Sequence, residues 1–242
     1  AVVWQRAQRR SPWLGDVCKS LVDNASHGCG ALVNDGRATL PGGTCTRSKE
    51  AGESPSDNGG NSWYVIDNHC GTMIIQDGVT VEATGRHSSL IRNVGESGSP
   101  ATLNVEGGNF TNAFNTLKND DYGTMNISGD AVIMSTAETA VNNWGTLIVS
   151  GSPTITGETG ISVYSWTDDY VTEVTVSGGT TTGTAEVYIS DGETSSGVGQ
   201  QGGTTTLTIQ GGTIRGANQE DAPYPLHDAE GGDPTNAEFD PE

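Results

Sequence analysis

The chain has 242 residues, a formal net charge of −19 and only 17% charged residues, with Gly at 35 positions. This length accommodates one or two domains. A surface this acidic repels phosphate backbones, so we expect no nucleic-acid partner. No apolar run approaches the roughly 20 residues that a membrane-spanning helix needs, so we expect no membrane insertion within this segment.

The first segment, residues 1–62, shows no repeat and is rich in turn-forming residues. A stack of repeats needs a cover at its end, because the first turn would otherwise expose open strand edges and core side chains. We therefore interpret 1–62 as an irregular N-terminal cap. Apolar residues at roughly helical spacing are expected to pack over the start of the stack at 63–66: Trp13, Leu14, Val17, Leu21 and Val22.

All four cysteines fall in the first third of the chain, at Cys18, Cys29, Cys45 and Cys70. No Cys-x-x-Cys pair is present, which argues against a structural zinc site. An even number of cysteines in a segment without core periodicity favours two disulfides formed in an oxidising compartment, and therefore an extracellular or cell-surface location. The three possible connectivities stay open, as does the alternative of unpaired thiols.

Residues 63–217 contain six copies of an apolar-x-apolar strand, and all but the first close with x-Gly. The copies lie at 73–75, 103–107, 125–129, 147–151, 174–178 and 207–211. Their first residues are 30, 22, 22, 27 and 33 positions apart, which indicates a base unit of 22 residues with insertions of different length.

Each unit holds two further short β-prone pieces, separated by Gly, Asn, Asp and Ser corners. Because β-branched residues dominate and no 3.6-residue period appears, the pieces are strands and not helices. Stacking such coils about 4.8 Å apart pairs each strand with its counterparts above and below. Connections between parallel strands run right-handed. The sequence therefore predicts an all-β, right-handed parallel β-helix (β-solenoid) of about six three-strand coils. We expect it to be a monomer.

The phrase AVNNWGTLIVSGSPTITG, Ala140–Gly157, resembles the A-[IV]-x-N-x-G-x-L-x-[IV]-x-G-G-x-[IV] repeat of pectin-lyase-like β-helix regions in large bacterial surface proteins. The resemblance covers roughly 150 of the 242 residues. It implies the fold and, for function, either a polysaccharide-degrading enzyme or a non-enzymatic adhesin or stalk. The chain departs from the tidiest repeats in its longer third corners and at Thr181, where Val or Ile is usual.

Carboxylates, amides and aromatic rings recur just before the lead strands of three consecutive coils. The candidate ligand-binding residues are Asp120, Asp121, Tyr122, Asn142, Asn143, Trp144, Asp168, Asp169 and Tyr170. Counting back from each lead strand places them at one corner, with the three rings in a stripe. Sugar rings stack on aromatic faces, while carboxylates and amides bind hydroxyls, so the pattern indicates a glycan track.

Three other interpretations of this corner remain. Hard oxygen ligands could bind calcium. Asp pairs two coils apart suit an inverting glycosidase, whose carboxyl groups lie about 6.5–9.5 Å apart. Asn119 with Asn142 or Asn143 could instead form a structural amide ladder without any ligand.

No catalytic residue is assigned, because no known catalytic signature is present. Polysaccharide lyases of the resembled fold use basic residues, and Lys118 is the only Lys or Arg in the sequence from 93 to 214.

From residue 218 to 242 the chain has eight acidic residues and no Lys or Arg, which predicts a disordered tail or linker. We therefore expect a non-enzymatic, exported cell-surface segment of an adhesin or stalk that binds a neutral glycan or a host-surface ligand. The alternatives are a carbohydrate-active enzyme, either a glycoside hydrolase or a polysaccharide lyase, and a purely structural spacer.

Overall fold

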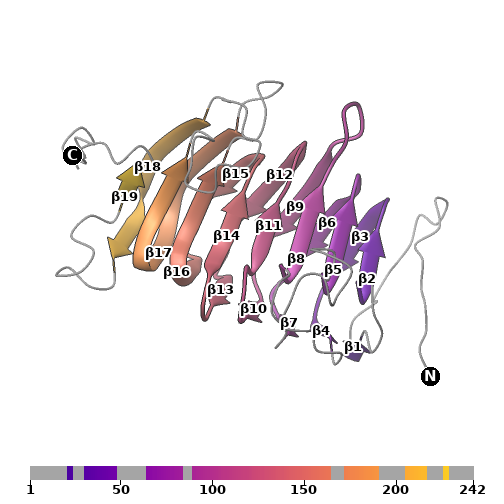
Figure 1. Ribbon diagram of the computed structural model, residues 1–242. Coiled ribbons are helices and arrows are strands. Elements are labelled where there is room, and N and C mark those ends of the chain that lie inside the picture. The colour runs from indigo at the N-terminus through magenta and orange to yellow at the C-terminus, as the bar shows by residue number, and fades with distance from the viewer. Residues whose placement is uncertain are drawn as a thin grey trace, which may run out of the picture.

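The structure, a computed structural model, describes residues 21–23, 30–47, 64–83, 89–164, 172–190, 205–216 and 226–228. Each regular element in these ranges is a β-strand, and none of these residues lies in a helix. The strands belong to one 19-stranded sheet and are stacked along a single axis, from the N-terminal strands to β19 (Figure 1). The predicted all-β, parallel-strand architecture is therefore confirmed.

Strands pair in parallel with the strand three places further along the chain, which sorts them into three columns. Column A contains β3 (Arg37–Leu40), β6 (Thr72–Ile75), β9 (Ala101–Val105), β12 (Gly123–Ile127) and β15 (Thr146–Val149). Column B contains β1 (Leu21–Asp23), β4 (Gly43–Arg47), β7 (Val79–Ala83), β10 (Asn109–Asn112) and β13 (Val132–Ser135). Column C contains β2 (Leu32–Asn34), β5 (Ile66–His69), β8 (Ile91–Val94), β11 (Leu117–Asn119) and β14 (Thr139–Asn143).

Beyond β15 the strands turn corners and continue from one column into the next. β16 (Thr154–Tyr164) pairs with β13 in column B and with β14 in column C. β17 (Thr172–Ser190) passes through all three columns, and β18 (Thr205–Gly216) continues columns A and B. β19 (Leu226–Asp228) pairs with β17 in column C.

The core lies between the columns and is built mainly by alternation of buried and outward side chains along the strands. In β15, Leu147 and Val149 are fully buried, whereas Ile148 is 38% exposed. Leu147 is in register with Met125 below it and with Val174 above it, so the same inward position repeats from turn to turn. This confirms the predicted strand register, because a slip by one residue would expose every apolar side chain of the strand.

The stack extends beyond both predicted boundaries. Strands β2, β3 and β4 form a full turn beneath β5–β7, within the segment predicted to be an irregular cap. Leu21 and Val22, predicted at helical spacing, lie in β1 and pair with β4. Leu226–Asp228, predicted to be disordered, forms β19. The parallel pairing therefore begins before residue 63 and reaches past residue 217.

The two described cysteines occupy different environments. Cys45 is buried in β4, and Cys70 lies at the corner that follows β5 with a left-handed φ of 55°. Cys18 and Cys29 lie outside the described residues, as do Trp13, Leu14 and Val17. The disulfide connectivity therefore stays a prediction.

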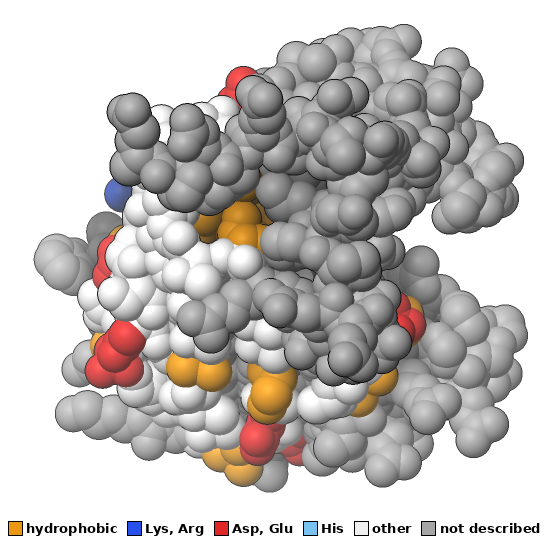
Figure 2. All heavy atoms as spheres, turned by 90° about the vertical axis from the view of Figure 1, so that its left-hand side faces the viewer, with side chains coloured by type: hydrophobic (Ala, Val, Ile, Leu, Met, Phe, Trp, Pro, Cys, Tyr) orange, Lys and Arg blue, Asp and Glu red, His pale blue; other side chains and the backbone are white. Residues whose placement is uncertain are grey.

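Apolar side chains that reach the described surface are scattered. Val132 and Met134 lie on β13 in column B, whereas Ile148 lies on β15 in column A. The view in Figure 2 likewise shows separate apolar patches among polar side chains and no continuous apolar face. The described surface in this view therefore does not resemble an obligate hydrophobic interface.

Candidate functional site

The corner between columns C and A is held by a ladder of buried asparagine side chains. Each Nδ2 donates to the Oδ1 of the asparagine in the next turn, at 2.6, 2.7, 2.8 and 2.7 Å for the pairs Asn34–Asn68, Asn68–Asn93, Asn93–Asn119 and Asn119–Asn143. The same nitrogens donate to main-chain carbonyl groups at the corner, including those of Gly123 and Gly145. Because water does not reach these amides, the ladder satisfies polar groups that would otherwise be costly to bury.

Glycine is required where the chain leaves this ladder for column A. A Cβ atom at Gly123 would overlap Asn119 Oδ1, and one at Gly145 would overlap the carbonyl oxygen of Gly123. Glycine at these two positions is therefore a packing requirement, because the backbone there passes directly over the ladder amides and over the previous turn.

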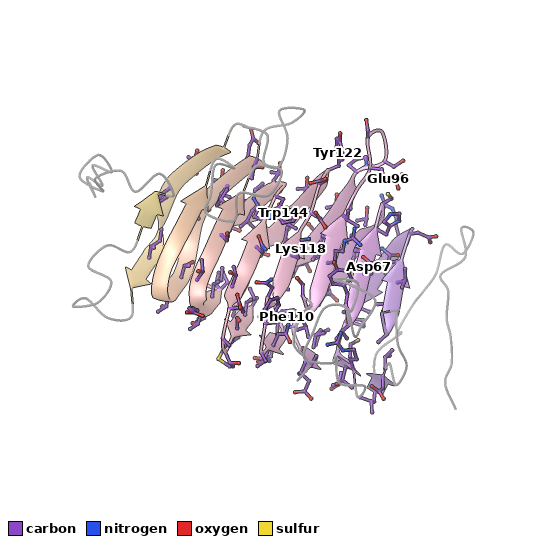
Figure 3. The ribbon with its side chains drawn as sticks, in the orientation of Figure 1. Asp67, Glu96, Phe110, Lys118, Tyr122 and Trp144 are labelled. Atoms are coloured by element: carbon purple, nitrogen blue, oxygen red, sulfur yellow. The ribbon has the colours of Figure 1, made fainter. Side chains whose placement is uncertain are left out.

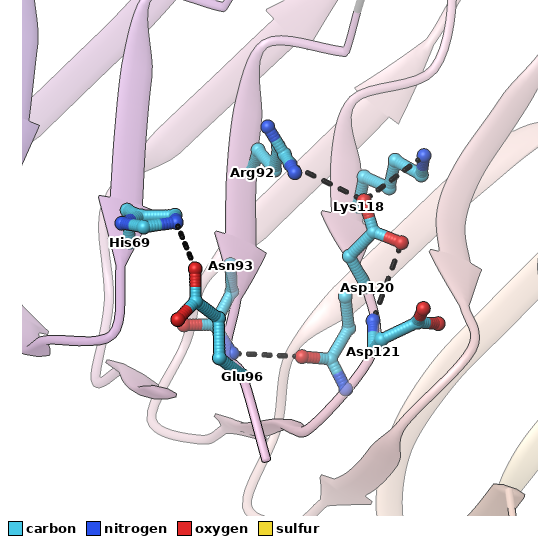
Figure 4. Close-up of polar contacts among 8 residues, drawn as sticks. His69, Arg92, Asn93, Glu96, Lys118, Asp120 and Asp121 are labelled. Carbon is cyan, nitrogen blue, oxygen red and sulfur yellow. Dashed lines mark hydrogen bonds and ion pairs between the residues drawn. The ribbon is translucent and has the colours of Figure 1, made fainter. Parts of the chain in front are cut away.

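On the outward side of column C, polar side chains of successive turns are aligned. Asp67, Arg92, Lys118 and Asn142 occupy matching positions on β5, β8, β11 and β14. Asp120, just after β11, joins them, because its Oδ2 lies 3.2 Å from both Arg92 Nε and Lys118 Nζ (Figure 4). We call these five residues the outer row.

The outer row is shielded and formally neutral. The side chains of Arg92, Lys118 and Asp120 are only 26%, 15% and 11% exposed. Ion pairs this far from bulk water are screened less than ordinary surface pairs. Two aspartates balance one arginine and one lysine, so the row contributes no net charge to a chain whose net charge is −19.

Aromatic rings contact both cations of the row. The Arg92 guanidinium lies 5.2 Å from the centroid of the Tyr64 ring, and Lys118 Nζ lies 3.9 Å from that of Trp144. Both distances are within the range of cation–π attraction. Burial raises the pKa of Tyr64 to about 12, partly offset by the nearby Arg92 charge. Tyr64 is therefore a neutral hydroxyl at physiological pH, while Lys118 covers one face of Trp144.

Asp67 is the least satisfied member of the row. Its Oδ1 is buried and has no hydrogen-bond partner among the described residues. Burial raises the pKa of Asp67, and the positive charge of Arg92 offsets part of that rise. Buried polar atoms are nearly always paired, so this oxygen is an unsatisfied acceptor that is closed to solvent in this structure.

The structure brings together only part of the predicted corner site. Asn142 and Asp120 belong to the outer row, in which two ion pairs hold Asp120, and Trp144 adjoins the row. Asn143 is fully buried in the ladder, so its prediction as a ligand contact is wrong. The prediction that Asn119 and Asn143 could form a ladder is confirmed.

Tyr122 lies apart from Trp144 along the corner. The main-chain N of Trp144 donates to the Asn119 carbonyl, and the main-chain N of Asp120 donates to the Asn93 carbonyl in the same way. Trp144 therefore occupies the position in its turn that Asp120 occupies in the turn before. Tyr122 comes two residues later, is 38% exposed and has a left-handed φ of 53°. Figure 3 shows Tyr122 at the edge of the stack, whereas Lys118 and Trp144 lie on its broad face. The described part of the predicted aromatic stripe is therefore staggered.

Two further parts of the prediction have different outcomes. Asp121 lies at the exit of the corner, where its main-chain N donates to Asp120 Oδ1 at 3.2 Å. Asp168, Asp169 and Tyr170 lie outside the described residues. Calcium at Asp120 is disfavoured, because Arg92 and Lys118 already place two positive charges against its carboxylate.

Sequence reasoning missed Tyr64, Asp67 and Arg92. A usable signal was present, because column C strands carry an apolar-x-Asn triplet whose Asn enters the ladder. The triplets are 32–34, 66–68, 91–93, 117–119 and 141–143, and the middle residue of each points outward. Aligning the turns on this Asn would have placed Asp67, Arg92 and Lys118 side by side.

Comparisons with known proteins identify no relative. No family model, no curated protein and no solved structure matches the chain. No helix among the described residues is long and apolar enough to cross a membrane.

Proposed function

We propose that the chain is a non-enzymatic segment of an exported, cell-surface adhesin or stalk, folded as a right-handed parallel β-helix, and that its outer row binds a neutral glycan. The handedness rests on the general preference of parallel crossovers. The surface location rests on the resemblance to bacterial pectin-lyase-like repeats and on the cysteine pattern.

Glycan binding rests chiefly on one observation, the alignment of carboxylates and an amide on the outward side of column C beside an aromatic ring. A sugar hydroxyl can donate to Asp67, and others can bond the Asn142 amide. Trp144, which is part-buried, supplies apolar contact. The neutral charge of the row favours an uncharged sugar over a uronate polymer, which the acidic chain would repel.

The test is binding of the chain to an array of neutral and acidic glycans, followed by titration calorimetry. Trp144→Ala should weaken binding of a neutral glycan by roughly 1–3 kcal/mol without changing the melting temperature by more than a few degrees. Ile148→Ser is the matched control, because Ile148 is an exposed apolar residue in column A, outside the row. Absence of binding to every neutral glycan would favour the structural spacer.

A glycoside hydrolase is the second candidate, and the raised pKa of Asp67 favours it. A general acid must hold its proton near neutral pH, and burial moves Asp67 in that direction. Asp120, which contacts Arg92 and Lys118, would then be the second carboxyl group. Release of reducing ends from neutral polysaccharides, lost in both Asp67→Asn and Asp120→Asn, would establish catalysis. Binding without any such release supports the non-enzymatic function.

A further inference from the structure

A second group of potential ligands lies at the corner between columns C and A, and it begins two residues beyond Asp67 of the outer row. His69 ends β5, and Glu96 faces it from the loop after β8 (Figure 4). Cys70 follows His69 at the corner. One potential metal-ligating atom from each of these side chains lies within 4.8 Å of the other two. The group therefore combines an imidazole nitrogen, a sulfur and a carboxylate oxygen from two adjacent turns.

The main chain holds these three residues in place. Cys70 N donates to the Val94 carbonyl at 2.8 Å, which ties the first turn to the second. Glu96 and Ser99 exchange two main-chain hydrogen bonds, at 3.0 and 2.9 Å, around a tight turn in which Gly98 has a φ of 83°. Neither segment needs to refold for the side chains to converge, so a ligand would meet a largely preorganised site.

The spacing suits a tetrahedral metal ion. Zinc–nitrogen and zinc–oxygen bonds of about 2.1 Å and zinc–sulfur bonds of about 2.3 Å imply ligand-to-ligand separations of roughly 3.4–3.8 Å. His69 Nε2 and Glu96 Oε1 are already 3.6 Å apart. The sulfur needs to approach them by no more than about 1 Å, which rotation of the half-exposed His69 and exposed Glu96 side chains can supply.

We propose that His69, Cys70 and Glu96 bind a zinc-class divalent transition-metal ion when Cys70 is in its thiol form. Binding releases the thiol proton, because the thiolate is the ligand. Three protein ligands leave the fourth tetrahedral position to water. Cys70 is also a predicted disulfide partner, and a disulfide would remove the thiolate. Metal binding is therefore a property of the reduced chain, and it uses none of the five residues of the outer row.

The experiment titrates metal-free, fully reduced protein with Co²⁺ under anaerobic conditions and then displaces Co²⁺ with Zn²⁺. The wild-type chain should show the near-ultraviolet absorption of a thiolate–cobalt bond, and Zn²⁺ should abolish it. His69→Ala and Glu96→Gln should each raise the dissociation constant by about tenfold or more. Glu106→Gln is the control, because Glu106 is an exposed carboxylate outside the group, and it should leave the constant unchanged.

A second preparation keeps the outcome decisive if reduction disturbs the fold. Replacing Cys18 and Cys29 by Ser and Cys45 by Ala leaves Cys70 as the one cysteine of the chain. This variant needs no disulfide reduction before it is titrated. A thiolate–cobalt band in neither preparation would overturn the proposal. A band that His69→Ala and Glu96→Gln leave unchanged would overturn it equally, since Cys70 would then bind the ion alone.

Discussion

Removing one amide from the asparagine ladder should cost far more than removing an equal amide from the surface. In Asn119→Ala, Asn143 Oδ1 loses a 2.7 Å donor, and the carbonyl groups of Gly123 and Thr146 lose donors at 3.1 and 2.9 Å. Asn93 Nδ2 keeps a bond to the Thr124 carbonyl at 3.1 Å. Each buried group left unpaired costs about 1–3 kcal/mol, and each of the two carbonyl groups loses only one of its donors. The free energy of unfolding should therefore fall by about 3–5 kcal/mol.

Asn126→Ala provides a matched control within the same turn. Asn126 Nδ2 donates to Asn104 Oδ1 at 2.7 Å, the same length as the Asn119–Asn143 bond. This pair lies on the outward side of column A and is only part-buried, so water can replace the lost partner. The expected cost is about 0–1 kcal/mol.

Equilibrium unfolding in urea measures both variants. An unchanged denaturant slope with a lower midpoint would assign the effect to native-state stability. If Asn126→Ala lost as much stability as Asn119→Ala, burial of the ladder would not be the source of its contribution, and our account of the corner would be wrong.

Two further predictions concern register and charge. Val149→Asp buries an unpaired carboxylate and should cost several kcal/mol, whereas Ile148→Asp should cost less than about 1 kcal/mol; equal losses in urea unfolding would contradict the register. The raised pKa of Asp67 means that the folded chain holds this proton more tightly than the unfolded chain does. Its ionisation therefore destabilises the fold as pH rises through the unfolded value of about 3.9 towards the folded value. Asp67→Asn should be more stable than wild type at pH 7, and this advantage should disappear below pH 3.9; an advantage that persists in acid would refute the pKa argument.

The sequence was sufficient to predict the columns because alternation and repeat spacing are set by the pleat and by stacking. The missing first turn obeys the same rule, since Ala38-Thr39-Leu40-Pro41-Gly42 is a further apolar-x-apolar-x-Gly copy in register with the strand that begins at Thr72. The repeat pattern does not reveal this copy, because Ala38 is small and only weakly apolar and lies 35 residues before Met73, the first residue of the next copy. A long, variable insertion hides a repeat without weakening its pairing.

The outer row was harder to predict because corner length varies between turns. Asn119 and Asn143 are aligned, and so are Thr124 and Thr146, yet the first corner contains two more residues than the second. Counting back from the lead strand across such a corner displaces the alignment of the preceding residues by two positions. This displacement is why the count aligns Tyr122 with Trp144. The burial of Asp67 and its unpaired oxygen, moreover, depend on residues of other turns. The sequence of its own strand therefore does not predict them.

The geometry of column C separates stability from recognition. In each apolar-x-Asn triplet the flanking residues face the interior, where the amide must meet the amides above and below it. The middle residue faces outward and is Val33, Asp67, Arg92, Lys118 or Asn142 in successive turns, so charge can change there without disturbing the ladder. Asp120 couples two adjacent outward positions by pairing with both Arg92 and Lys118. A binding surface can therefore vary on this side of the stack while the inward sequence that folds the chain stays constant.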